Sequence, residues 1–185
     1  ILDIGGTIKT KKILTNHIIN KESIFENLNP DKKNKPDIVA YGEKTKFKNN
    51  ALDVVTVIEV LQYVNEIKPI LQEAKRIVKK KGLVIATFPF LYPELDDYVD
   101  RNRLTFKQIN LILREIFNKV KVHNCGGILG TIGMMIQLRS LKINNKFYSR
   151  LLNLFSYILC YTDFKFNNFN KKNIFTNGYI VILKK

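Results

Sequence analysis

The sequence predicts an α/β fold with a mostly parallel sheet, and three observations support this prediction. Short, almost continuously apolar segments alternate along the chain with longer segments of helical periodicity. The first apolar segment, residues 1–4, ends at Gly5-Gly6, which is typical of a buried strand that enters a tight turn. The 185 residues are 45% hydrophobic, enough for one domain with a sizeable core. We therefore expect a single domain over residues 1–185.

The apolar segments predict seven strands, at residues 1–4, 23–28, 37–41, 53–57, 83–88, 120–125 and 178–183. Apolar residues at three-and-four spacing predict helices at residues 66–80, 105–117, 128–141 and 147–161. Thr105 is the expected N-cap of the second helix. Lys79, Lys80 and Lys81 are expected to favour the end of the first helix, which Gly82 closes. Residues 9–20 are polar and basic with little periodicity.

The formal net charge of +15 indicates either an anionic partner or a strongly solvated surface. Lysine far outnumbers arginine and the basic residues are spread over the chain, so a solvated surface is favoured over a nucleic-acid interface. Two cysteines form neither a disulfide framework nor a metal site, and His17 and His123 lack metal-ligand spacing. We expect a cytoplasmic protein without a metal.

The chain opens inside a strand and without a methionine, which indicates a truncated N-terminus. No stretch reaches about 18 consecutive apolar residues, the length that a membrane span requires. The sequence therefore gives no clear transmembrane segment.

Five segments carry a resemblance to a known family. Residues 45–55 (Thr-Lys-Phe-Lys-Asn-Asn-Ala-Leu-Asp-Val-Val) and 59–64 (Glu-Val-Leu-Gln-Tyr-Val) are followed by residues 73–82, where Glu73 and Arg76 precede a Lys-rich turn at Gly82. Phe88-Pro89-Phe90 and residues 100–105 (Asp-Arg-Asn-Arg-Leu-Thr), which are similar to an Asp-Tyr-x-Arg-x-Thr element, complete the pattern. In this order and spacing, the chain resembles the methyltransferase type 11 group of class I S-adenosylmethionine-dependent enzymes.

The resemblance implies a Rossmann-like, seven-stranded sheet with helices on both faces and an antiparallel last strand. Residues 128–176 would be a helical insertion or cap before that strand. S-adenosylmethionine would lie across the carboxyl ends of the first, second and fourth strands, where ligands bind in sheets of this type. The implied activity is methyl transfer to a small-molecule acceptor.

The cofactor positions depart from the family pattern. In the first turn only Asp3 and Gly5 align with Asp-x-Gly-x-Gly-x-Gly, and Gly6 comes one place early. The acidic residue that holds the ribose diol is replaced by Asn27, with Glu26 beside it on the opposite face of the strand. Tyr41 stands where an acid near the adenine is common, and a tyrosine there either stacks on the base or packs. The predicted cofactor-binding residues are Asp3, Gly5, Gly6, Glu26, Asn27, Tyr41, Gly42 and Thr56.

The acceptor side has weaker candidates. Tyr63 occupies a position that is often histidine and could orient a hydroxyl, although packing is favoured. The loop after the fifth expected strand carries several charged residues: Asp96, Asp97, Asp100, Arg101 and Arg103. The carboxylates could act as a base and the arginines could hold a phosphate. Alternatively, the loop is only a solvated, salt-bridged segment. Tyr63, Asp100 and Arg103 are thus the catalytic candidates. The element at residues 100–105 resembles one found in a subgroup of the family that is often linked to surface sugars, and this resemblance implies a sugar or a lipid-linked sugar precursor as acceptor.

The apolar segment at residues 147–161 has three interpretations. With Lys146 and Arg150 at its start, it could lie on an anionic bilayer and hold the enzyme at the inner membrane surface. Packing on the chain's own core or in a homodimer is favoured.

Two other functions remain open for the whole chain. A degenerate fold acting as a non-catalytic scaffold would explain the three departures at the glycine turn, Asn27 and Tyr41. Nucleic-acid binding is the weaker alternative, prompted by the charge alone. An NAD-dependent reaction is disfavoured because Gly-x-Gly-x-x-Gly is absent after Asp3.

Overall fold

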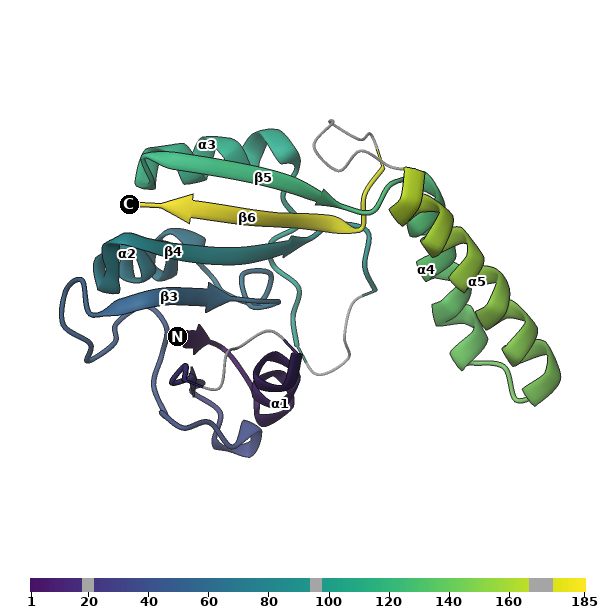
Figure 1. Cartoon of the computed structure of the whole chain (residues 1–185), viewed down its shortest axis with the longest axis horizontal. Coiled ribbons are helices and arrows are strands. Elements are labelled where there is room, and N and C mark those ends of the chain that lie inside the picture. The colour runs from purple at the N-terminus through teal and green to yellow at the C-terminus, as the bar shows by residue number, and fades with distance from the viewer. Residues whose placement is uncertain (18–21, 94–97, 167–174) are drawn as a thin grey trace. The chain divides into compact units, whose positions relative to one another are not determined.

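The computed structural model describes residues 1–17, 22–93, 98–166 and 175–185 (Figure 1). The chain divides into two compact units. The first consists of Ile1–Phe88, Glu94–Val122 and Ile180–Lys185, and the second of Pro89–Pro93 and His123–Tyr179. Each unit is described separately below.

A six-stranded sheet lies mainly in the first unit. Its strands are β1 (Leu2–Ile4), β2 (Glu26–Leu28), β3 (Leu52–Val57), β4 (Val78–Pro89), β5 (Lys119–Cys125) and β6 (Gly178–Lys184), in the order β2-β1-β3-β4-β6-β5. The pairs β1–β2, β1–β3 and β3–β4 are parallel. The arrow of β6 points against those of β4 and β5 in Figure 1. The predicted α/β class, with a mostly parallel sheet and an antiparallel last strand, is confirmed.

The expected strand count is wrong by one in the described part of the chain. Residues 37–41 form a single parallel bridge, between Leu28 and Ile38, instead of the predicted third strand. That bridge is closed by Ile38 N–H to Asn27 O and by Asn29 N–H to Ile38 O, both 3.0 Å. Beyond it Val39 and Tyr41 are exposed, so no apolar surface holds the segment against the edge of the sheet.

Two of the predicted helices pack in the first unit. Helix α2 (Ile67–Ile77) buries Ile70, Leu71 and Ala74, and α3 (Phe106–Ile116) buries Ile109 and Leu113. The Thr105 N–H donates to Gln108 Oε1 at 3.0 Å at the start of α3, which confirms Thr105 as its cap.

The boundary between α2 and the next strand differs from the prediction. Helix α2 ends at Ile77, and Lys79, Lys80, Lys81 and Gly82 all lie in β4. A Cβ on Gly82 would lie 2.5 Å from Asp53 O and 2.7 Å from Val78 Cγ2. Gly82 therefore serves the close approach of β3 to β4, at a register irregularity between Leu52 and Val54, instead of closing the helix.

The second unit consists mainly of a helical hairpin. Helices α4 (Ile128–Leu141) and α5 (Lys146–Phe166) are joined by a short turn and pack along each other (Figure 1). Both predicted helices are confirmed, and α5 is longer than its apolar pattern indicated. Two further elements, α1 (Ile8–His17) and a short 3₁₀ helix (Lys32–Asn34), belong to the first unit.

A buried carboxylate ties α2 to the loop before β3. Glu73 Oε1 accepts hydrogen bonds of 2.6 Å from both the N–H and the hydroxyl of Thr45. Arg76 donates to both carboxylate oxygens at 2.7 Å. Burial opposes ionisation of Glu73, but these donors together lower its pKa to about 2. The Glu-x-x-Arg motif at residues 73–76 is therefore a structural clamp.

We expect Glu73→Gln to destabilise the protein by about 2 kcal/mol at neutral pH, because the substitution removes an ionised acceptor from Arg76. A depressed pKa stabilises the folded state above the unfolded-state pKa and loses this effect as pH falls toward about 2. Urea unfolding of both proteins at pH 7 and pH 3 measures the difference, which should shrink at pH 3. A difference independent of pH would contradict the ionised clamp.

Candidate functional site

The turn after β1 is the part of the first unit in which the predicted cofactor residues gather. Gly5 has a φ of +78°, a backbone conformation that residues with a side chain rarely adopt. Its N–H donates to Leu28 O at 2.6 Å. A Cβ on Gly5 would overlap Val60 Cγ2, and one on Gly6 would overlap Asp3 Oδ2. Glycine is therefore required at both positions, because the side chains of Val60 and Asp3 occupy the space that a Cβ would need.

Asp3 lies beneath this turn with only 1% of its surface exposed. The Thr56 hydroxyl of β3 donates to Asp3 Oδ1 at 2.7 Å, so these two predicted residues are brought together. Burial raises the pKa of Asp3 to about 6, although the hydrogen bond from Thr56 opposes the shift. The carboxyl group consequently changes its charge near neutral pH.

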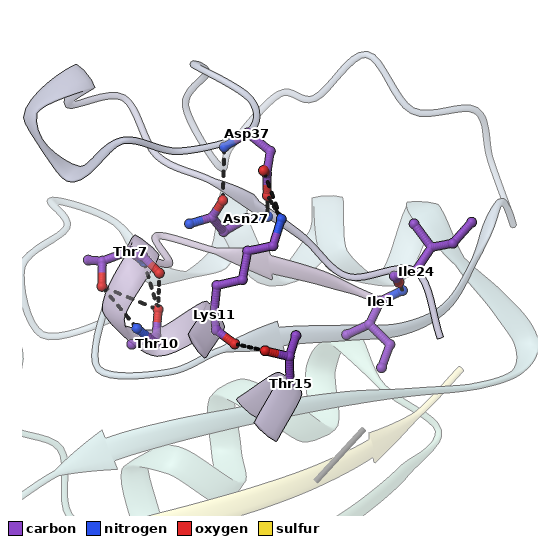
Figure 2. Close-up of polar contacts among 8 residues, drawn as sticks. All are labelled: Ile1, Thr7, Thr10, Lys11, Thr15, Ile24, Asn27 and Asp37. Carbon is purple, nitrogen blue, oxygen red and sulfur yellow. Dashed lines mark hydrogen bonds and ion pairs between the residues drawn. The ribbon is translucent and has the colours of Figure 1, made fainter. Parts of the chain in front are cut away.

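Helix α1 follows the turn directly, although the sequence did not predict it. Thr7 and Thr10 cap its first turn reciprocally (Figure 2): the Thr7 N–H donates to Thr10 Oγ1 at 2.7 Å, and the Thr10 N–H donates to Thr7 Oγ1 at 3.2 Å. This is a Thr-x-x-Thr version of the capping box, and it is the one signal that could have located the helix. The turn is thus a strand–glycine–helix connection, as in nucleotide-binding α/β folds.

Asn27 lies on β2 opposite Asp3 of β1 and is fully buried. Its Oδ1 accepts the Asp37 N–H at 2.8 Å, and its own N–H donates to Asp37 Oδ2 at 2.9 Å. Asn27 Nδ2 is buried and has no hydrogen-bond partner. The carbonyl oxygen of the side chain is therefore occupied by the protein, while its amide nitrogen has no partner.

Asp37 is a site residue that the sequence analysis missed. Lys11 reaches from α1 to both oxygens of its carboxylate, at 2.8 and 2.7 Å (Figure 2). Partial burial opposes ionisation, but Lys11 and the Asn27 N–H together hold the pKa of Asp37 below its usual range. Asp37 therefore supplies a negative charge beside the position where the family has an acid and this chain has Asn27.

Asn29 was also missed, and it closes the turn from the side of β2. Its Nδ2 donates to Gly5 O at 2.9 Å and to Gly6 O at 3.3 Å. Asn29 lies at the carboxyl end of β2, which could have identified it as a site residue.

The remaining cofactor candidates are spread around this turn. Glu26 is half-buried and pairs with Leu2 on the adjoining strand, one position before Asn27. Gly42 is buried, and a Cβ there would lie 2.5 Å from Ile4 Cγ2. Tyr41 is 70% exposed, so it does not pack in the core. Its ring is accessible to a planar ligand.

The three catalytic candidates form a cluster in the first unit. Tyr63 lies against Tyr98 with ring centroids 5.1 Å apart, and Arg103 forms an ion pair with Asp100. The Arg101 N–H donates to Gln62 O at 2.7 Å, which attaches this segment to the loop after β3. Burial and the negative charges of Asp100 and Glu59 raise the pKa of Tyr63, so it can donate a hydrogen bond at neutral pH but is not a base. Asp96 and Asp97 lie outside the described residues.

Glu59 adds a strained backbone at the carboxyl end of β3. Its φ is +55°, although it is not a glycine. Thr87 of β4 holds it through two hydrogen bonds, from its hydroxyl to Glu59 Oε1 at 2.9 Å and from the Glu59 N–H to Thr87 Oγ1 at 2.8 Å. This geometry positions Val60 over Gly5, so the Glu-Val-Leu motif shapes the glycine turn.

A separate apolar hollow of about 380 Å³ lies within the second unit. It is formed by the segment after β4 and by α4, and it is lined by Phe90, Leu91, Tyr92, Pro93, Met134, Met135 and Leu138. None of these residues was a candidate in the sequence analysis.

The described residues form neither a metal-binding cluster nor a membrane-spanning helix. There, no three His, Cys, Asp or Glu side chains are grouped so that they could hold a metal ion. No described helix combines the length and the apolar character needed to cross a bilayer.

We expect Asp3→Asn to become more favourable for stability as pH rises. A raised pKa means that ionisation of Asp3 costs stability, a cost that is absent below pH 3.8 and complete above about pH 6. Relative to the unsubstituted protein, Asp3→Asn should therefore gain about 2 kcal/mol between pH 4 and pH 7.5. Urea midpoints of both proteins at the two pH values measure this gain, and an unchanged difference would show that Asp3 is not buried as described.

The chain is similar to known methyltransferase domains in sequence. Residues 15–86 match the type 11 family of methyltransferase domains. An uncharacterized protein of Methanocaldococcus jannaschii is 31% identical over 151 residues, which cover 80% of this chain and 55% of that protein. The chain thus spans little more than half the length of this curated relative.

Solved methyltransferase structures share the fold. A SAM-dependent methyltransferase from Archaeoglobus fulgidus superposes with a TM-score of 0.61 at 15% identity, over 100% of this chain and 85% of that one. A Haemonchus contortus phosphoethanolamine N-methyltransferase, in complex with phosphomonomethylethanolamine and S-adenosylhomocysteine, has a TM-score of 0.58 at 14% identity, over 100% of this chain and 48% of that one. The chain therefore has the fold of the class I S-adenosylmethionine-dependent methyltransferases, with residues 15–86 matching the type 11 methyltransferase domain, as its sequence motifs predict.

Proposed function

We propose that this protein transfers a methyl group from S-adenosylmethionine to a small-molecule acceptor. The observation that carries the proposal is the strand–glycine–helix turn at Gly5-Gly6, which lies within the methyltransferase fold directly above Asp3. When bound, S-adenosylmethionine supplies a methyl group activated by a positively charged sulfur, so an acceptor lone pair displaces a neutral thioether. The protein then has to position the acceptor and exclude water.

The residues around the turn fit a nucleoside. Asn27 Nδ2 is a buried donor without a partner at the position where the family binds the ribose. Such a donor destabilises the protein by about 1–3 kcal/mol when it is left unpaired, and a ribose hydroxyl would satisfy it. The exposed ring of Tyr41 would stack on the adenine. Asn27 thus offers one neutral hydrogen bond where a carboxylate would offer two charged ones.

The acceptor proposed within the small-molecule class is a lipid-linked precursor, such as a sugar on an apolar carrier. The hollow of about 380 Å³ between the segment after β4 and α4 has only apolar and aromatic side chains and proline in its lining, which suits an apolar chain. Tyr63 can donate a hydrogen bond to an acceptor hydroxyl. Arg103 donates to Asp100 Oδ2, from Nε at 3.0 Å, which links two residues of the loop that carries them.

A non-catalytic scaffold with a methyltransferase fold is the second candidate. One observation favours it: Asn27 replaces the usual acid, is fully buried, and has its oxygen occupied by Asp37. Binding of S-adenosylhomocysteine separates the two candidates, because a scaffold has no reason to retain the nucleoside site.

We expect calorimetric titration with S-adenosylhomocysteine to give saturable binding. Tyr41→Ala should weaken it by about tenfold, because stacking of an aromatic ring on a base contributes roughly 1–3 kcal/mol. Tyr148→Ala in α5, which is similarly exposed, is the matched control and should bind like the unsubstituted protein. An absence of heat at sub-millimolar ligand would overturn the enzyme proposal in favour of the scaffold.

A further inference from the structure

In the α4–α5 hairpin the buried residues are small or polar, and many large apolar residues are exposed. The buried residues of α4 are Gly130, Thr131, Gly133 and Ser140, and those of α5 are Ser156 and Asp163. By contrast, six large apolar side chains of α5 are 51–72% exposed: Phe147, Leu151, Leu154, Phe155, Ile158 and Phe164. Two helices that pack together in water normally bury their apolar side chains between them.

The contacts inside the hairpin are those of closely approaching helices. A Cβ on Gly133 would lie 2.7 Å from Cys160 Sγ, and one on Gly130 would lie 2.7 Å from Asp163 Oδ2. The Ser156 hydroxyl donates to Gly133 O at 2.7 Å, and Ser140 Oγ lies 2.6 Å from Asn153 Oδ1. Small residues at the contact, with hydrogen bonds between helices, are the pattern of helices that pack in an apolar solvent.

The charges of the hairpin are one-sided. Arg139, Lys142, Lys146 and Arg150 are all exposed and lie at its tip, residues 139–150. Asp163 is the only acid in residues 128–166, and it is buried as the acceptor of the Gly127 N–H at 2.6 Å. The exposed surface of the hairpin therefore combines apolar side chains with positive charge and carries no negative charge.

We propose that this hairpin docks on the surface of an anionic lipid bilayer. Lipid tails accept the apolar side chains of both helices, and anionic headgroups complement the cations of the tip. The hairpin lies in the interface and does not cross it, because crossing would bring the four cations of the tip into hydrocarbon. A second hairpin offers no complementary charge, since it exposes the same cations.

The first experiment is co-sedimentation of the full chain with vesicles. We expect binding to vesicles of phosphatidylcholine mixed with phosphatidylglycerol, and little binding to phosphatidylcholine alone. The variant with Arg139, Lys142, Lys146 and Arg150 all replaced by Gln should bind at least about fiftyfold more weakly, because each cation at an anionic surface strengthens binding by roughly fivefold.

The matched control removes the same charge from the first unit. Lys44, Lys46, Lys48 and Lys81 are exposed there, and their replacement by Gln leaves the net charge equal to that of the hairpin variant. This control should retain its binding. An equal loss in both variants would overturn the proposal, because the attraction would then come from the overall charge of +15.

A second measurement reports insertion directly. The chain has no tryptophan, so Phe155→Trp places a single reporter on the exposed face of α5. Its emission should shift to the blue on anionic vesicles, while that of the control Val39→Trp in the first unit should not. The proposal would be overturned if the chain bound no vesicles and sedimented as a dimer that became monomeric when Leu151, Phe155 and Ile158 were replaced by Gln. The exposed face of α5 would then be an interface with a second copy of the chain.

Discussion

The conformation of the chain after β1 depends on the buried carboxyl group of Asp3, which lies directly beneath the turn at Gly5-Gly6. Asp3 occupies the space that a side chain on residue 6 would need, and Val60 occupies the corresponding space at residue 5. The turn is then fixed from three directions, by Thr56 on β3, by Asn29 at the end of β2 and by the threonine cap of α1. The position of α1, and with it Lys11 and Asp37, follows from this arrangement.

Most of the sheet and the helices α2 to α5 could be predicted, because their apolar residues recur at the period of the element and are buried on one face. The hairpin is an informative exception: the apolar pattern located both helices although those side chains are exposed. Periodicity therefore indicates where a helix forms, and it does not indicate what covers the helix.

The errors have identifiable physical causes. Helix α1 has no buried residue among those whose burial is described, so its formation depends on the Thr7–Thr10 cap and not on an apolar stripe. The Lys79–Lys81 run resembles a helix end, but it lies in β4, where the pairing with β3 changes register between Val78 and Leu83. Within the site, the structure brings the candidates Asp3 and Thr56 into contact, whereas Asp37 and Asn29 were missed because both act through contacts between distant residues. Alternation along one strand gave no information about the partner that Asn27 finds ten residues later.

The overlap at Gly6 has a consequence for tracing the history of such chains. Selection for folding alone preserves Gly5 and Gly6, because a methyl group at either position collides with the protein's own interior. A lineage that abandons catalysis would keep this pair while the exposed Ile8 and Lys9 drift. The presence of these two glycines in a related sequence therefore does not indicate catalytic activity, because packing alone retains them. Positions whose neighbours leave room for another residue are the ones that report on activity.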